Sequence, residues 1–235
     1  TDDNFASIAA AVEEGRAIYD NIIKAVHFLL SCNISEILLM LFAVLFGLPL
    51  PLLPVQILWI NLVTDGVPAL ALAVEPGDPE IMRRPPRRPK ARILERDRLL
   101  LMFAQGLFIA MITVVAFIYC LYGMDQDLDR ARTLTFTILV VAQLTHAFNC
   151  RSDRRSLFQL GVWSNKALVA GVALSLGLQA MIIFSPLVRE IFRVTPFDPE
   201  HWILAFGIGV LPLIAMELWK AAQHRLKPHE ELTTR

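Results

Sequence analysis

The sequence predicts an all-α membrane protein in which six transmembrane helices form a bundle and a polar helix leads into the first of them. The first observation is composition: 55% of the 235 residues are hydrophobic and the mean hydropathy is +0.53, above the range of soluble domains. The second is six separate apolar runs, each near the roughly 20 residues that cross a bilayer. The third is an uneven distribution of basic residues between the connections. A soluble bundle is the alternative, but six such runs rarely occur in one soluble domain.

The six runs, with the segments before and after them, divide the chain into three parts. The transmembrane part, residues 25–220, contains the runs at 25–46, 53–74, 99–121, 133–149, 166–186 and 201–220. Residues 1–24 carry a helical pattern of apolar residues among Glu and Arg, and they contain no proline. We therefore expect a cytosolic stalk helix that continues into the first run. Residues 221–235 are expected to form a cytosolic tail.

The orientation follows from the lysine and arginine residues. Eighteen of the 22 lie in or at the edge of the N-terminal segment, the loops 75–98 and 150–165, and the C-terminal segment, whereas the other three loops hold four. Because short cytosolic connections are enriched in basic residues, both chain ends are expected in the cytosol. An even number of spans agrees with this orientation.

Several classes of protein are excluded by composition and motifs. The net charge of zero excludes a bulk basic nucleic-acid binder. The three cysteines lie far apart without a CxxC pair, which excludes a disulfide scaffold or zinc ribbon, and no His or Cys pair is expected to hold a soft metal. There is no GxxxxGK[ST] or GxGxxG motif and no nucleophile with a base. We therefore expect no catalytic residues in this chain and no ATP hydrolysis by the chain alone.

Two acids lie deep within the first two runs. Glu36 and Asp65 have no basic residue in their runs, and a charge there costs about 2.5–3.5 kcal/mol on insertion scales, so its default interpretation is functional. The turn between the runs centres between Leu50 and Pro51, and each acid lies 14 residues from it. Equal distances from the turn give similar depths in an antiparallel helix pair. The two carboxylates are thus expected to face each other near mid-membrane.

Oxygen-bearing side chains accompany both acids at helical spacing. Asn33 lies one turn before Glu36, while Asn61 and Thr64 share a helix face with Asp65. Amide, hydroxyl and carboxylate oxygens are hard ligands of the kind that Ca²⁺ prefers. The hairpin therefore predicts a metal site made of these five residues.

Polar residues in the later runs have two interpretations each. Gln143 in the fourth run is either a sixth oxygen ligand or a polar contact between helices. His146, three residues further on, is expected to be such a contact or to lie near the surface. Glu217 at the end of the sixth run is expected to anchor the interface.

Two residues after Asp65 predict a break in the second run. Pro68 has no backbone N–H for the helix ladder, and Gly66 tolerates unusual dihedral angles. The helix is expected to be unwound here, which would free backbone carbonyl groups for an ion.

Three strings resemble P-type cation-transporting ATPases of the calcium-pump type. The sixth transmembrane helix of that family, with the loop after it, is similar to LPVQILWINLVTDGVPALALAVEPGDPEIMRRPPR. Its fifth-helix ion-binding segment is similar to SCNISE, and the stalk before that helix is similar to DDNFASIAAAVEEGRAIYDNI. The resemblance covers the whole chain, is strongest in residues 1–98, and implies the C-terminal six helices of such a pump.

The resemblance also implies an ion and its ligands. In the calcium pumps, the positions that match Asn33, Glu36, Asn61, Thr64 and Asp65 bind the transported Ca²⁺, and some relatives carry Mn²⁺ as well. The family has a carboxylate where this chain has Gln143. This departure puts a stoichiometry of two ions per cycle in doubt.

Further implications concern partners and location. ATP and Mg²⁺ would be bound by the phosphorylation, nucleotide-binding and actuator domains, so the expected partners are those N-terminal domains of the same polypeptide and membrane lipid, with no nucleic acid. In the family, the loop after the sixth helix contacts the phosphorylation domain. The candidates here are basic residues of the proline-rich loop, with anionic lipid headgroups as the alternative partner: Arg83, Arg84, Arg87 and Arg88. A bacterial plasma membrane is the expected location.

Two other functional classes stay open on the residues alone. One is a cation channel or ion-coupled secondary transporter that uses Glu36 and Asp65. The other is a structural membrane anchor whose buried polar residues only join helices. A DKTGT phosphorylation motif encoded upstream would favour the pump.

Overall fold

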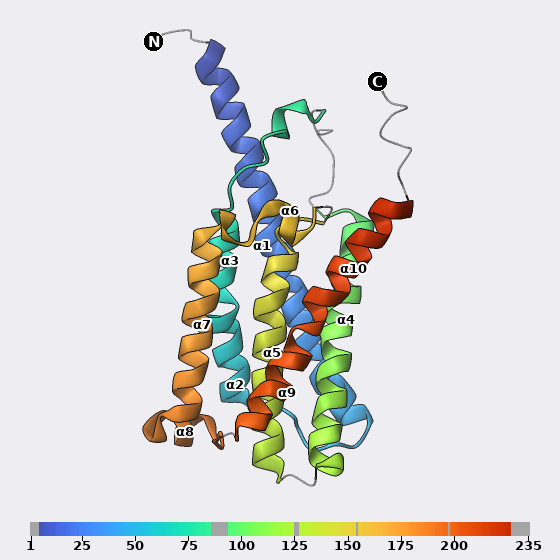
Figure 1. Ribbon diagram of the computed structural model, residues 1–235, viewed down its shortest axis with the longest axis vertical. Coiled ribbons are helices and arrows are strands. Elements are labelled where there is room, and N and C mark those ends of the chain that lie inside the picture. Colours follow the sequence, from blue (N-terminus) through green and yellow to red (C-terminus); the bar gives the residue numbers. More distant parts are fainter. Residues whose placement is uncertain (1–4, 86–93, 125–126, 154, 197, 227–235) are drawn as a thin grey trace.

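The computed structural model describes residues 5–85, 94–124, 127–153, 155–196 and 198–226, and no residue in these ranges lies in a strand. The helices run along one common axis, with their connections gathered at the two ends of the bundle (Figure 1). The start of α1 and the end of α10 lie at the same end. The prediction of an all-α protein is confirmed.

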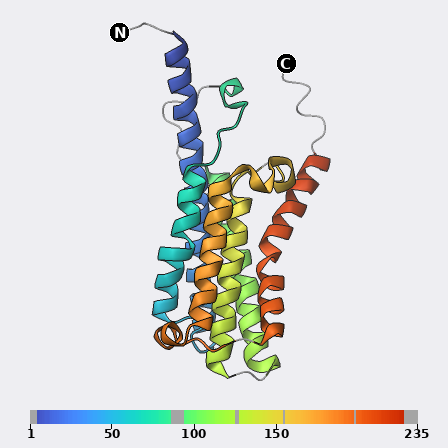
Figure 2. The same cartoon turned by 60° about the vertical axis from the view of Figure 1, so that its left-hand side comes forward.

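The longest helix is α1, Phe5–Leu45, which has 41 residues. Its first part projects beyond the bundle and its second part lies within it (Figures 1 and 2). The polar N-terminal segment and the first apolar run therefore form one uninterrupted rod. The helix ends in a Schellman turn, because Gly47 adopts a φ of +66° and the N–H of Leu48 donates to the carbonyl of Ala43 at 2.8 Å.

The second pass through the bundle is made of three helical pieces. Helix α2, Pro54–Trp59, begins with a proline at its first turn, where the missing N–H has no cost. A π-helical turn, η1, covers Ile60–Thr64, and α3 covers Gly66–Ala73. A short 3₁₀ turn in the connection that follows is η2, Ile81–Arg83.

The rest of the chain supplies four more passes and their connections. The long helices are α4, Arg96–Ile118, with a terminal π turn η3, Tyr119–Gly123; α5, Leu128–Asn149; α7, Lys166–Phe184; and the pair α9, Pro199–Gly209, and α10, Leu211–Leu226. The connections hold α6, Leu157–Leu160, η4, Val162–Ser164, and α8, Pro186–Phe192.

Among the described residues, five helical stretches are long and apolar enough to cross a membrane. They are Phe5–Leu45, Pro54–Ala73, Arg96–Gly123, Lys166–Phe184 and Pro199–Gln223. Helix α5, which matches the predicted fourth span, has 22 residues but is not among them. It is buried along most of its length by the other helices, so it needs less apolar surface toward lipid. The division into six spans stays a prediction.

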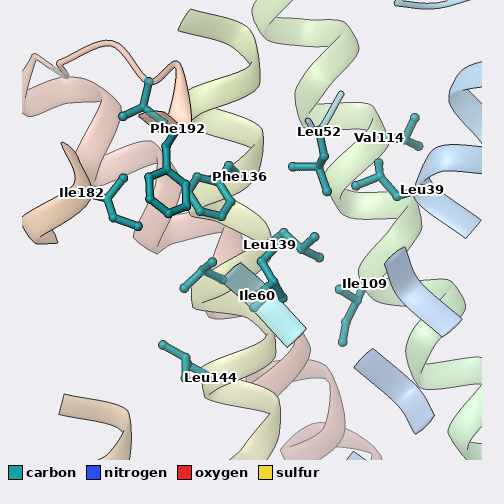
Figure 3. Close-up of a cluster of buried hydrophobic side chains, with 13 residues drawn as sticks. Leu39, Leu52, Ile60, Ile109, Val114, Phe136, Leu139, Leu144, Ile182 and Phe192 are labelled. Carbon is teal, nitrogen blue, oxygen red and sulfur yellow. The ribbon is translucent and has the colours of Figure 1, made fainter. Parts of the chain in front are cut away.

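The apolar core lies where α5 meets its neighbours. Figure 3 shows buried side chains from α1, η1, α4, α5 and α7 meeting there, among them Leu39, Ile60, Ile109, Phe136 and Ile182. This packing holds the first, second and fourth predicted spans against one another. It thereby sets the positions of the polar residues on the same helices.

Candidate functional site

The polar cluster in the bundle is centred on Glu36 of α1. One oxygen of its carboxylate accepts a hydrogen bond from the Asn61 amide of η1 at 2.6 Å. The other oxygen accepts one from the Gln143 amide of α5 at 3.0 Å. Glu36 is only 5% exposed, so both bonds lie in a dry environment. Three of the six predicted ligands, on three different helices, are therefore in direct contact.

Asp65 is fully buried at the junction of η1 and α3. Neither of its carboxylate oxygens has a hydrogen-bond partner among the described residues. A buried carboxylate without a cationic partner is strongly unfavourable unless a cation or proton neutralises it. Asp65 thus presents two hard carboxylate oxygens inside the bundle.

The remaining predicted ligands bond to their own helices. The Thr64 hydroxyl donates to the carbonyl of Ile60 at 2.9 Å, and the Asn33 amide nitrogen donates to the carbonyl of Leu29 at 2.7 Å. These bonds leave the Asn33 side-chain oxygen and the Thr64 lone pairs as acceptors. The structure does not join either residue to the Glu36 cluster.

The second pass widens at Asp65 but does not unwind. The Asp65 N–H donates to the carbonyl of Ile60, five residues earlier, at 2.9 Å, and an α-helix resumes at Gly66. A Cβ atom on Gly66 would come no closer than 4.0 Å to the Asn61 carbonyl, so this backbone does not require glycine there. The α-helix is therefore interrupted at Asp65, as the sequence predicts, but by a π turn and not by an unwound segment. A π turn accommodates Pro68 while most backbone groups keep a hydrogen bond in apolar surroundings.

The basic loop contacts the projecting part of α1. Arg84 forms ion pairs with Asp20 of α1 at 2.7 Å and with Asp78 at 2.5 Å, and its carbonyl accepts a bond from Arg16 at 2.9 Å. Arg83 pairs with Glu80 at 3.3 Å on the surface. Two further candidates for this loop, Arg87 and Arg88, lie outside the described residues. The loop is therefore fastened to the stalk through Arg84.

Asp78 is the acidic centre of that loop. Partial burial acts to raise the pKa of its carboxyl, but the Glu80 N–H and the guanidinium groups of Arg84 and Arg155 outweigh it and hold the pKa below the usual value. The carboxylate therefore stays charged to a lower pH than an isolated aspartate.

Sequence reasoning missed a buried ion pair between two connections. Arg151, after α5, places two guanidinium nitrogens 2.9 and 2.8 Å from one oxygen of Glu75, after α3. Asn165 at the start of α7 donates to the other oxygen, and Asn21 of α1 donates to the Glu75 carbonyl at 2.6 Å. Glu75 lies 54, 76 and 90 positions along the chain from Asn21, Arg151 and Asn165. Only the fold brings this network together.

The sequence predicts no His or Cys pair placed for a soft metal, but the structure brings such side chains together. His146 and Cys150 lie one helical turn apart, and Cys150 Sγ is 3.3 Å from His146 Nε2. His27 of α1 lies beside them, with its ring centroid 6.2 Å from that of His146. The spacing of four residues places His146 and Cys150 on one helix face, and this is the sequence signal from which the pair could be predicted.

Comparison with known proteins fits this arrangement of helices and polar residues. Residues 49–222 match the family described as cation transporting ATPase, C-terminus. The chain therefore belongs to this family, and its apolar helices make it an integral membrane protein. The resemblance inferred from the NISE and NLVTDGVPA segments is confirmed at the level of the family.

Two bacterial relatives are similar over most of this chain. It is 42% identical to a calcium-transporting ATPase of Bacillus subtilis (strain 168) over 211 residues, which are 90% of this chain and 24% of the relative. It is 40% identical to calcium-transporting ATPase 1 of Bacillus cereus (strain ATCC 10987 / NRS 248) over 238 residues, which are 95% and 27% of the two chains. The chain thus spans about a quarter of the length of these relatives.

Proposed function

We propose that this chain is the ion-binding membrane part of an ATP-driven pump that exports Ca²⁺ from the cytosol. The observation that carries the proposal is the pair of buried carboxylates, Glu36 and Asp65. One is held by amide groups and the other has no oxygen or nitrogen partner in the described part of the bundle. The names of the two relatives, both calcium-transporting ATPases, support the choice of ion.

The residues of the Glu36 cluster can become ion ligands with small movements. Asn61 and Gln143 now direct N–H groups at Glu36. A half-turn of either terminal amide replaces the N–H with a carbonyl oxygen, so the same residues can serve as ligands. The Gln143 side-chain oxygen and both Asp65 oxygens have no hydrogen bond to break. Oxygen ligands of these types suit Ca²⁺, with Mn²⁺ as the alternative ion.

The continuous helix α1 supplies the coupling to ATP hydrolysis. The stalk and Glu36 belong to one rod, and 31 residues separate Phe5 from Glu36, about 46 Å at the helical rise of 1.5 Å per residue. A tilt of the stalk moves Glu36 relative to Asn61 and Asp65, so affinity and access change together. ATP and Mg²⁺ act through the N-terminal domains of the whole protein, and the basic loop around Arg84 is the proposed contact with them.

The charge count favours one divalent ion per cycle. Glu36 and Asp65 carry two negative charges, which balance one divalent ion, and Gln143 adds a neutral amide that contributes no charge toward a second. The proposed location is a bacterial plasma membrane with both chain ends in the cytosol, which the basic residues at the stalk end support.

The decisive measurement is Ca²⁺-stimulated ATP hydrolysis by the full-length protein with Asp65→Asn. We expect stimulation to be lost, because the substitution removes the unpaired charge and keeps the shape. Asp129→Asn is the matched control, because this acid is exposed at the end of the bundle opposite to the stalk. This substitution should leave stimulation intact. Normal stimulation in Asp65→Asn, or Ca²⁺ movement driven by an ion gradient without ATP, would refute the proposal.

A further inference from the structure

A second group of potential metal ligands lies at the stalk end of the bundle, apart from the Glu36 cluster. It consists of His27 on α1, His146 on α5 and Cys150 directly after α5, exposed by only 1%, 0% and 2%. Each offers one ligand atom, and these atoms all lie within 4.8 Å of one another. His27 precedes Glu36 by nine residues, about 13 Å along the helix. Two imidazoles and a thiol form a set that suits Zn²⁺ and similar cations.

The His27 ring is already oriented in the way that metal-ligating histidines usually are. Its Nε2 is 2.5 Å from the Gln105 side-chain oxygen, which can only accept, so the proton lies on Nε2. Gln105 is itself held by a bond from its amide nitrogen to Met216 Sδ at 3.2 Å. A histidine that donates one N–H to a fixed oxygen presents its other nitrogen as a ligand.

The free nitrogen of His27 faces a carboxylate. With the proton on Nε2, Nδ1 carries a lone pair, and it lies 3.6 Å from Asp153 Oδ1. A lone pair and a negative oxygen at this distance repel unless a cation or proton lies between them. Asp153 is 28% exposed, so it also gives the buried group a polar route to the surface.

His146 has a hydrogen-bond partner on only one of its two ring nitrogens among the described residues. Its Nε2 contacts Cys150 Sγ, while its Nδ1 is buried without a hydrogen-bond partner in the described part of the chain. A neutral imidazole has one donor and one acceptor nitrogen, and the thiol satisfies only one of them. Buried polar atoms are seldom left unpaired in a site that is only structural.

The nearby positive charges are already paired with acids. Arg98 lies 3.2 Å from the second oxygen of Asp153, and Lys220 lies 3.1 Å from Glu217. Their charges are therefore partly balanced. They reduce the attraction for a cation, but they do not occupy the group of ligands.

We propose that His27, His146 and Cys150 bind a borderline or soft transition-metal cation, such as Zn²⁺ or Cd²⁺. Binding breaks the S–H bond of Cys150, forms a sulfur–metal bond and releases the proton to solvent, while both imidazoles donate lone pairs as neutral groups. Ca²⁺ is a poor competitor, because it takes oxygen ligands. The site is distinct from the Glu36 cluster in position and in ligand chemistry.

The bound ion would join α1 to the end of α5. Since the proposed transport cycle requires α1 to tilt, Zn²⁺ at this site is expected to inhibit turnover. This consequence rests on the proposed function, whereas metal binding itself does not.

The test is a Cd²⁺ titration of the full-length, chelator-stripped protein in detergent, with Ca²⁺ in excess to fill oxygen sites. Binding is followed by the ultraviolet charge-transfer absorption of a cadmium–thiolate bond. We expect the wild type to show a band that Cys150→Ser removes. Cys120→Ser is the matched control, because this buried thiol belongs to a cluster near η3, and it should retain the band.

Two further measurements make the result decisive. Ca²⁺-stimulated ATP hydrolysis without Cd²⁺ checks that Cys150→Ser is folded. His27→Gln keeps the thiol but removes a ligand from the other helix, and we expect it to weaken Cd²⁺ binding at least about tenfold. Identical titrations of the wild type and Cys150→Ser, or unchanged affinity in His27→Gln, would overturn the site. If the cadmium band depends on Cys150 but the wild type shows no Ca²⁺-stimulated ATP hydrolysis, the result counts against the proposed pump function and not against the metal site.

Discussion

At the scale of single residues, the two buried acids are accommodated in different ways. Glu36 has a hydrogen bond on each carboxylate oxygen, and both donors are neutral amides. Asp65 has no such donor and is fully enclosed. The two amide donors stabilise the charge of Glu36 without an ion. The charge of Asp65 is strongly unfavourable unless a cation or proton neutralises it. Gln143 donates its amide nitrogen to Glu36, while its side-chain oxygen has no hydrogen-bond partner in the described part of the bundle.

Replacing Gln143 with Glu should therefore change the cooperativity of Ca²⁺ activation. The substitution removes a donor to Glu36 and adds a third carboxylate, which raises the negative charge of the site from two to three and so favours a second divalent ion. We expect the Hill coefficient of Ca²⁺-stimulated ATP hydrolysis to rise above that of the wild type. Gln143→Met, which removes the oxygen without adding charge, should lower the apparent Ca²⁺ affinity instead. Activation curves that coincide for all three proteins would contradict this assignment.

At the scale of helices, close approach between backbones determines which side chains meet. A Cβ atom on Gly106 of α4 would lie 2.7 Å from the Ser31 carbonyl and 2.9 Å from the Ile34 Cβ of α1. Small residues allow such approaches in membrane bundles, where packing drives helix association. The α1–α4 contact thus depends on a position without a side chain. Through this contact, α4 supports α1 on the side opposite to the one that faces Asn61.

Gly106→Ala is expected to destabilise the bundle by about 1–3 kcal/mol, the usual effect of overpacking. The backbone atoms of α1 cannot move aside, so α4 must shift. Gly177→Ala in α7 is the control, because a Cβ there meets nothing within 4 Å. Thermal unfolding of the full-length protein in detergent should show a lower midpoint only for Gly106→Ala. Equal midpoints for both variants would mean that the crossing tolerates a methyl group.

The ion pair between Arg151 and Glu75 links the connection after α3 to the connection after α5. Its side chains are 1% and 5% exposed, and removal of one partner leaves a buried charge unpaired. We expect Arg151→Ala to reduce stability by about 3–5 kcal/mol. Arg155→Ala, which removes a 44% exposed side chain from its pairs with Asp78 and Glu80, should cost less than about 1 kcal/mol. Chemical denaturation of both variants provides the comparison, and a small effect of Arg151→Ala would show that the network is dispensable.

At the scale of the whole molecule, the two ends of the bundle differ in chemistry. The stalk end holds the basic loop, the Glu75–Arg151 network and the His27 group, whereas the Glu36 cluster lies further along α1, within the apolar part. One continuous helix, α1, passes through all of these regions (Figure 1). A movement of the stalk therefore reaches each of them. This arrangement suits a protein whose chemistry and ion site are far apart.

The orientation of the bundle can be tested with membrane-impermeant thiol reagents. The native cysteines of this chain are buried, so they should label weakly. Asp129→Cys and Glu80→Cys place thiols at opposite ends, at positions where the native side chains are 58% and 57% exposed. We expect Asp129→Cys to be labelled in intact cells and Glu80→Cys only in inside-out vesicles, because basic residues favour the cytosolic side. The reverse pattern would contradict the proposed topology.

The class of fold and most of the candidate ligands can be predicted from the amino-acid sequence. Long apolar runs can satisfy their backbone groups only as helices in a membrane, so the class of fold followed from composition and run length. Glu36 and Asp65 were found because an acid in such a run is costly and has few structural uses. The equal distances from the turn at Leu50 and Pro51 indicated that their helices meet at one depth. Glu36 does contact the second pass there, through Asn61.

The pairing of polar groups, in contrast, depends on how the helices pack. Gln143 reaches Glu36 across 107 positions, and Arg151 reaches Glu75 across 76, because packing around α5 brings these segments together. The same packing explains why α5 is less apolar than its neighbours: it faces protein on most sides. The π turn before Asp65 and the meeting of His27 with Cys150 likewise depend on how helices settle against one another. Helix periodicity specifies a face, but the partner of that face is chosen by the packing of the whole bundle.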